Sequence, residues 1–388
     1  MDKSRILIIH PEGNLNNNPN LSGIVEIFCE ENYLVDVVSP KRRFPQLAPC
    51  EGSRLLLFDD RIVKYSSKIP FLKGLSKALS HIRMSQYSRT DYKLIIGVDR
   101  DGVIEASYLS QLLGIPYGLI SYEIFFKDET NAEFKNEETK ACAHLAFAVC
   151  QDDVRSALLA KENHIPLEKI INIPVAGRGV RKGEKMQYLH NMLNISSNKK
   201  IALYMGSIAK WSMIEELVQS VDSWPDEWVL VLHNRYGMNS KVRKLIGDKH
   251  SKSIYISKEL YPKPGDLSEM LHSADLGIAL YKPIFNGIYT GNNLKYLGLS
   301  SGKIAMYLQH GIPVLTNENG LISDYIRANG AGYVIDSINE IPELLESINQ
   351  RECGSEGAYA LFKGKLDLEQ QIGPLMNKVE NMMRICLT

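Results

Sequence analysis

Two serines, a glycine and a lysine precede a predicted helix in the second half of the chain, where they could bind a diphosphate. Ser300, Ser301, Gly302 and Lys303 stand directly before the apolar run IAMYL. A serine can cap a helix, and the N–H groups and dipole at a helix start attract anions. Gly302 permits a close backbone approach, and Lys303 adds a positive charge. A plain serine-capped helix explains the same residues without a ligand.

Other polar residues follow the predicted strands of this half. They are Gly206, Ser207 and Lys210 at and after IALYMGS, Arg235 after WVLVLHN, and Asn292 and Asn293 in the long loop after DLGIALY. Basic side chains at strand ends can pair with phosphate, and arginine can do so in a bidentate manner. Asparagine can bind sugar hydroxyls, but beside a glycine it is also an ordinary turn residue. A solvated lysine and a surface arginine are the alternatives for the two cations.

The first half has its own candidates. Gly13 and Asn14 belong to the polar loop PEGNLNNNPNLSG, which follows the strand RILIIH and fits an acceptor or cleft loop. Glu123 ends another predicted strand at the same edge and is a candidate general base. Asp152 also follows a strand, but its position is more typical of a helix N-cap.

Asp99 and Asp101 follow the strand KLIIGV and form a DxD pattern. Two such carboxylates could hold Mg²⁺ or Mn²⁺ against a diphosphate. The pattern is weak, however, and Asp101 before Gly102-Val103-Ile104 also fits a helix cap. We therefore predict no metal site.

The spacing of apolar runs predicts the elements that position these residues. Short, almost unalternating strands alternate with helical segments, which is typical of parallel sheets covered by helices on both faces. A polar stretch at 176–199 separates two such series. We predict an α/β fold of two Rossmann-like, doubly wound domains facing across a cleft. The domains are residues 1–176 and 177–355, and a helix within 356–388 packs back toward the first domain.

The composition excludes several functional classes. The 388 residues carry 45 basic and 45 acidic side chains, so no overall field favours nucleic acid. The six cysteines include no CxxC pair, which is typical of a reduced cytoplasmic protein without a zinc site. No dinucleotide fingerprint, P-loop or nucleophile elbow occurs, and no cofactor is predicted.

The segment 61–90 carries charges of one sign only. RIVKYSSKIPFLKGLSKALSHIRMSQYSR contains seven Lys and Arg residues and no acid, with an apolar stripe at helical spacing in its second part. Such a helix suits an anionic membrane surface or a lipid-diphosphate acceptor. The alternative is the solvated face of an ordinary amphipathic helix.

The segment from Ser273 to Asn317 resembles the donor-binding core of GT-B glycosyltransferases of the family-4 type, also called bacterial-type glycosyl transferase group 1. The matching residues are Ala274-Asp275-Leu276, then Lys303, Ile304, Tyr307, Gly311, Pro313 and Val314. IALYMGSIAKW and AHLAFAVCQDDVR are similar to two further family segments. One residue departs from the pattern, because Met306 stands where the family has a glutamate that binds the donor's ribose.

The resemblance implies a retaining, metal-independent hexosyltransferase of the EC 2.4 type, acting in polysaccharide biosynthesis. Its donor would be a nucleotide-sugar bound by the domain 177–355, for which UDP is favoured, and its acceptor a glycan or a lipid-linked glycan bound by the domain 1–176. The protein would be cytoplasmic, with peripheral membrane contact through residues 61–90 and without nucleic acid. Two alternatives use the same fold. One is a non-catalytic partner subunit, which the missing glutamate favours, and the other is a UDP-sugar epimerase.

Overall fold

The chain folds into two compact units. The computed structural model describes residues 3–11, 15, 18–41, 48–59, 84–234, 244, 246–247, 253–257, 267–349 and 355–385. Unit 1 contains Met1–Pro174 together with Gln371–Thr388, and unit 2 contains Val175–Gln370. Gly13, Asn14 and Arg235 lie outside the described residues, as does most of the basic segment 61–90. The predictions made for these residues stay predictions.

Unit 1 is built on a parallel sheet whose seven described strands run in the order β3-β2-β1-β4-β5-β6-β7. They are β1 (Arg5–Ile9), β2 (Leu34–Pro40), β3 (Ser53–Phe58), β4 (Tyr92–Val98), β5 (Tyr117–Ile120), β6 (Phe147–Cys150) and β7 (Ile170–Asn172). The order reverses between β1 and β4. The connections after these two strands therefore diverge, which opens the carboxyl edge of the sheet to ligands.

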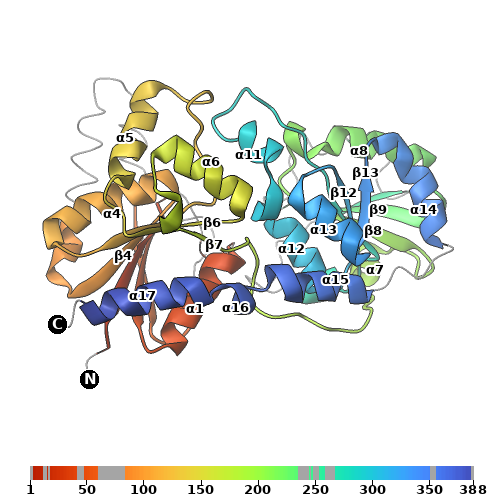
Figure 1. Cartoon of the computed structure of the whole chain (residues 1–388). Helices are drawn as coiled ribbons and strands as arrows, with labels where there is room; N and C mark the ends of the chain where they lie inside the picture. The colour runs from red at the N-terminus through yellow and green to blue at the C-terminus, as the bar shows by residue number, and fades with distance from the viewer. Residues whose placement is uncertain are drawn as a thin grey trace. The chain divides into compact units, whose positions relative to one another are not determined.

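The helices of unit 1 cover both faces of this sheet. They are α1 (Pro19–Glu30), α4 (Asp99–Leu113), α5 (Ala132–Cys142), α6 (Asp153–Asn163) and α17 (Gly373–Ile385). In Figure 1, α4 and α5 lie on one face and α1 and α17 on the other. Helix α1 begins where the sequence favours it, because the Asn18 side chain accepts a hydrogen bond from the Leu21 N–H at 3.0 Å and Pro19 takes the first helical position.

Unit 2 repeats the plan with a parallel sheet of six described strands in the order β10-β9-β8-β11-β12-β13. They are β8 (Lys200–Gly206), β9 (Trp228–Asn234), β10 (Ile254–Ser257), β11 (Leu276–Ala279), β12 (Val314–Asn317) and β13 (Gly332–Ile335). Here the order reverses between β8 and β11, so the segments that follow these two strands frame the expected ligand edge.

Helices also cover both faces of the second sheet. They are α7 (Tyr188–Leu193), α8 (Ile214–Ser220), α10 (Ser268–Leu271), α11 (Asn292–Lys295), α12 (Gly302–Gln309), α13 (Leu321–Asn329), α14 (Ile341–Asn349), α15 (Ser355–Leu361) and α16 (Leu368–Gln371). Side chains of α12, α13 and α15 share one apolar core, and those of α8 and α14 share the other. The predicted α/β class is confirmed.

The stretch 176–199, predicted as the connection between the two series, contains the helix α7. The run SRLLLF was not expected to form a strand, yet it is β3, at the sheet edge, where Arg54 forms an ion pair with the buried Asp36 of β2 at 2.7 Å. Among the described residues, no helix is both long and apolar enough to cross a lipid bilayer.

Candidate functional site

Tyr307 fixes the position of α12 on the sheet of unit 2. Its hydroxyl donates to the Leu203 carbonyl at 2.7 Å and accepts from the Met205 N–H at 3.0 Å, so it bonds directly to β8. Its ring lies on Gly277 of β11, where an added Cβ would come within 2.4 Å of the ring. Only glycine leaves room for this contact. The start of α12 is thereby held beside the carboxyl ends of β8 and β11.

Ser301 caps α12, as predicted. Its Oγ accepts a hydrogen bond from the Ile304 N–H at 3.2 Å and lies 2.5 Å from the hydroxyl of Tyr281, which follows β11. Ser300 does not share this role, because its hydroxyl donates to the Leu297 carbonyl at 2.6 Å. Gly302 is the first residue of the helix. A helix start in this position is suited to binding an anion.

Lys303 lies on two aromatic rings beside the end of β8. Its Nζ is 4.1 Å from the centroid of the Tyr204 ring and 5.3 Å from that of Tyr281. Gly206 has φ of +128°, and a Cβ there would lie 3.3 Å from the Lys303 Cε. Burial raises the pKa of Tyr204 to about 12 and that of Tyr281 still further, so both phenols stay neutral. The cation therefore contacts the faces of two neutral phenol rings.

An open pocket of about 520 Å³ adjoins these residues through Trp211. The Trp211 and Tyr281 rings are stacked, with centroids 6.2 Å apart and planes at 7°. The pocket is lined by Lys210, Trp211, Ile284, Asn286, Gly287, Ile288, Tyr289 and Thr290. Hydrogen bonds in both directions between Ile284 and Thr290 close the loop that forms its wall. Lys210 therefore lies at a cavity of ligand size.

The remaining predicted residues of unit 2 are placed as follows. Ser207 accepts a hydrogen bond from the Tyr204 hydroxyl at 2.6 Å through its backbone carbonyl. Asn292 and Asn293 are the first residues of the short helix α11, and both are buried. Met306 is half-buried and packs against the apolar core of the α12 face. A methionine in this place cannot accept a hydrogen bond as a carboxylate does.

In unit 1, Asp99 occupies the turn between β4 and α4 in an unusual conformation. Its φ is +55°, a left-handed value that few non-glycine residues adopt. The Asp99 Oδ1 accepts hydrogen bonds from the N–H groups of Tyr122 and Glu123 at 2.7 and 3.0 Å. Burial raises its pKa to about 7, and the nearby Glu123 charge acts in the same direction against these two hydrogen bonds. From the sequence, the only role that the DxD pattern indicated for Asp99 was that of a metal ligand.

Glu123, the predicted base, contributes its backbone to this arrangement, and its side chain is exposed. Asp101 was predicted as a helix cap, and this is wrong. The helix begins at Asp99, and the Asp101 carboxylate pairs with Arg100 at 2.7 Å. Asp152 does cap its helix, since its Oδ1 accepts from the Arg155 N–H at 3.0 Å. Within the described part of the chain, no group of three or more His, Cys, Asp or Glu side chains could hold a metal ion.

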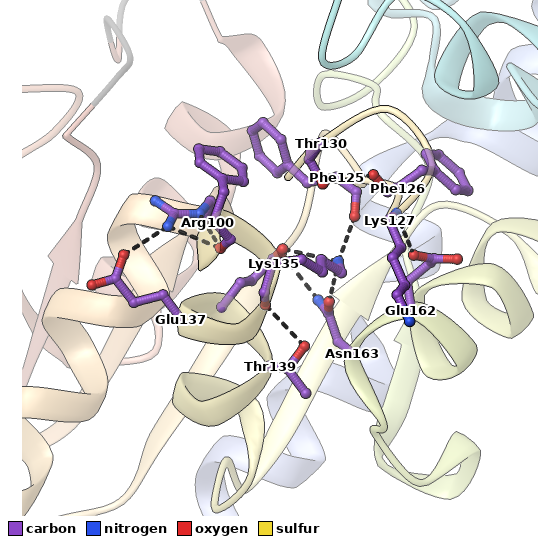
Figure 2. A network of polar contacts seen from close by, with 12 residues as sticks. Arg100, Phe125, Phe126, Lys127, Thr130, Lys135, Glu137, Thr139, Glu162 and Asn163 are labelled. Carbon is purple, nitrogen blue, oxygen red and sulfur yellow. Dashed lines mark hydrogen bonds and ion pairs between the residues drawn. The ribbon is translucent and has the colours of Figure 1, made fainter. Parts of the chain in front are cut away.

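A buried lysine fastens the loop 121–131, which carries the two N–H groups. Figure 2 shows Lys135 of α5 directed at the Phe125 carbonyl and at Asn163 of α6. The Lys135 Nζ also pairs with the Glu138 carboxylate at 2.9 Å. Two residues after Phe125, the Lys127 N–H donates to Glu162 at 2.8 Å. These contacts hold the loop against two helices.

Comparison with known proteins identifies the architecture. The chain is similar to Anabaena HepE in complex with UDP-glucose, at 10% identity and a TM-score of 0.73 over 97% of this chain and 99% of the other. It is also similar to a Rickettsia africae glycosyltransferase, at 12% identity and a TM-score of 0.69 over 99% of both chains. The chain has the GT-B fold. Residues 236–355 match the family described as glucosyltransferase 3-like, C-terminal domain. No curated protein matches the chain.

These structural matches confirm the GT-B fold that the resemblance of the segment from Ser273 to Asn317 implied. Sucrose-phosphate synthase from Thermosynechococcus elongatus is a further match, at 12% identity and a TM-score of 0.66 over 99% of this chain and all of the other. The sequence did not reveal the aromatic residues around Lys303. Tyr204 lies on β8 and Tyr281 just after β11, and neither belongs to a motif. Their places near the carboxyl ends of two adjacent strands are the signal that could have indicated them.

Proposed function

We propose that this GT-B protein is a glycosyltransferase that binds a nucleotide-sugar in unit 2, with the diphosphate at the start of α12. The observation that carries the proposal is Lys303, held over two neutral tyrosine rings beside Gly206 and the Ser301 cap. The match of residues 236–355 to a glucosyltransferase-like domain supports it. UDP is the favoured nucleotide, since HepE structures contain UDP and UDP-glucose.

The residues at the helix start can stabilise the leaving nucleoside diphosphate. Charge accumulates on the phosphate oxygens as the sugar departs, and N–H groups, a helix dipole and a lysine offset it. The Lys303 Nζ is buried against the two rings. A charge-assisted hydrogen bond to phosphate is stronger than a contact with a ring face, so we expect the lysine to rotate toward the ligand. We further propose a retaining reaction that needs no metal ion.

Nucleotide binding by a matched pair of variants tests this site. Lys303→Met should weaken UDP binding by about 1.5–3 kcal/mol, the scale of a hydrogen bond to a charged group. Lys200→Met is the control, because Lys200 also lies over an aromatic ring, that of Trp228 at 5.6 Å, but at the opposite end of β8. Calorimetry should show weaker UDP binding by Lys303→Met and unchanged UDP binding by Lys200→Met. Equal affinity of Lys303→Met and the wild type would exclude Lys303 from the site.

Metal dependence is tested on the same protein. UDP should raise the melting temperature in EDTA as much as in Mn²⁺, because the proposed phosphate partners are a lysine and backbone groups. UDP release from UDP-glucose should likewise survive EDTA. Loss of both in EDTA, with recovery in Mn²⁺, would contradict the metal-independent reaction.

A non-catalytic partner subunit is the second candidate function. Met306 favours it, because the half-buried thioether packs on the core where the family has its ribose-binding glutamate. Turnover distinguishes the two. Release of UDP from UDP-glucose by the purified chain would exclude this alternative, whereas UDP binding without any turnover would support it.

A further inference from the structure

The turn that carries Asp99 is compressed against the sheet. A Cβ at Gly97 would lie 2.4 Å from the Gly102 carbonyl carbon, and one at Gly102 would lie 2.6 Å from the Ile9 carbonyl oxygen. Both glycines therefore allow α4 to begin immediately after β4. As a consequence, Asp99 adopts a left-handed φ. This conformation places its side chain at the carboxyl edge of the sheet. Strained backbone of this kind is concentrated at functional sites.

The two carboxylate oxygens of Asp99 differ in their hydrogen bonds to the described residues. Both hydrogen bonds, from Tyr122 and Glu123, reach Oδ1. Oδ2 makes no hydrogen bond to any residue that the structure describes, and 7% of the residue remains exposed. A carboxylate oriented in this way can accept one more hydrogen bond from a ligand.

The groups around Asp99 select against an anionic ligand. The negative charges of Glu123 and of Glu138 on α5 both raise the pKa of Asp99, so they would also repel an anionic ligand. Arg100, the adjacent cation, donates instead to the Phe134 carbonyl, Asp101 and Glu137, as Figure 2 shows in part. A phosphate would be repelled here, whereas a neutral hydroxyl donor fits.

The loop that orients Asp99 is anchored by hydrogen bonds to three helices. Lys135 ties the Phe125 carbonyl to α5 and α6, and on α6 Arg155 donates to the Tyr122 carbonyl at 3.0 Å. The Tyr122 hydroxyl donates to Asn20 of α1 at 2.8 Å. Three helices therefore hold the two N–H groups that fix the carboxylate. Such preorganisation is what a binding group needs in order to discriminate between ligands.

We infer that the Asp99 carboxylate binds a hydroxyl group of a neutral sugar during the glycosyl transfer proposed above. The hydroxyl belongs either to the donor's glycosyl group or to the acceptor, and in both cases it donates to Oδ2. This inference rests on the proposed function and adds a sugar-binding residue in unit 1. The pKa of about 7 then makes binding depend on pH, because the ionised carboxylate accepts the hydrogen bond more strongly than the protonated group does.

The test compares Asp99→Asn with Asp101→Asn, the same substitution two residues further on, outside the proposed site. Asparagine tolerates the left-handed conformation and keeps an oxygen for the two N–H groups. The assays are UDP release from UDP-glucose without acceptor, and transfer to D-glucose at high concentration. Asp99→Asn should lower kcat/KM by about tenfold or more. It should also remove the fall in activity below about pH 7 that we expect of the wild type.

The two assays separate the sources of the hydroxyl. A loss already present without acceptor assigns it to the donor, and a loss confined to transfer assigns it to the acceptor. UDP affinity should stay within twofold of the wild type, since UDP has no glycosyl group. An Asp99→Asn protein with unchanged kcat/KM and unchanged pH profile in both assays would overturn the inference alone. A wild type that neither binds UDP nor turns over UDP-glucose would overturn the proposed function, and this inference with it.

Discussion

Asp99 should make the stability of unit 1 depend on pH in a sense opposite to that of a typical ion-paired aspartate. Its pKa rises from 3.8 to about 7 on folding because burial penalises the charged form. A raised carboxyl pKa means that the folded state binds more protons, so its stability is highest at low pH and falls as pH rises from about 4 to about 7. At about 1.4 kcal/mol per pKa unit, the whole window corresponds to about 4 kcal/mol.

Asp99→Asn removes this titration while keeping the turn. Between pH 5 and pH 8 the wild type should lose about 2.5 kcal/mol more than the variant, because part of the window lies below pH 5. Hydrogen exchange of peptides covering residues 92–131 measures unit 1. Tryptophan fluorescence is the internal control, because Trp211, Trp224 and Trp228, all the tryptophans of the sequence, lie in unit 2.

The comparison has a clear negative result. If the two proteins change in parallel within about 0.5 kcal/mol between pH 5 and pH 8 in the unit 1 peptides, Asp99 does not titrate near neutrality, and the linkage argument is refuted. A difference seen equally in the tryptophan signal would place its origin outside the turn.

Three further substitutions probe the supporting structure. Tyr307→Phe should destabilise unit 2 by about 1–3 kcal/mol in urea titrations followed by tryptophan fluorescence, because it leaves the Leu203 carbonyl and Met205 N–H without their partner; an unchanged midpoint would show that α12 is positioned otherwise. Met306→Glu should cost about 1–3 kcal/mol in the same assay without tightening UDP binding, because it places a charge against the apolar core; tighter binding in calorimetry would contradict this. Lys135→Met should destabilise unit 1 by about 3–5 kcal/mol in hydrogen exchange, because a buried carboxylate loses its cation; unchanged protection of residues 121–131 would refute the role given to this lysine.

The sequence predicted the elements whose residues are uniformly apolar. Strands β5 and β6 are wholly buried, so their runs stand out from the surrounding residues. Strand β3 was missed because it mixes exposed and half-buried residues, and its place depends on the pairing of Arg54 with Asp36. That pairing is a tertiary contact, which no local pattern contains.

The candidate site was predictable only where one segment carries it. Ser301 and Lys303 are close in sequence and belong to one helix start, so the pattern indicated them together. The conformation of Asp99 could not be predicted in this way. It follows from the contacts of Gly97 and Gly102 with neighbouring backbone, which place the helix directly after the strand. The sequence pattern alone does not show where the helix starts, so it cannot distinguish a DxD metal site from a helix cap.

If Lys303 binds the donor diphosphate as proposed, its environment explains how one cation serves both the protein without ligand and the phosphate. Tyr204 and Tyr281 stay neutral because burial raises the pKa of each phenol. A ring face attracts an ammonium group by about 0.5–2 kcal/mol, whereas a hydrogen bond to a charged group contributes about 1.5–3 kcal/mol. These ranges overlap, so a lysine that exchanges the rings for a diphosphate oxygen changes its interaction free energy little. A carboxylate partner would retain the cation more strongly, so an aromatic support suits a lysine that must change partners at each turnover.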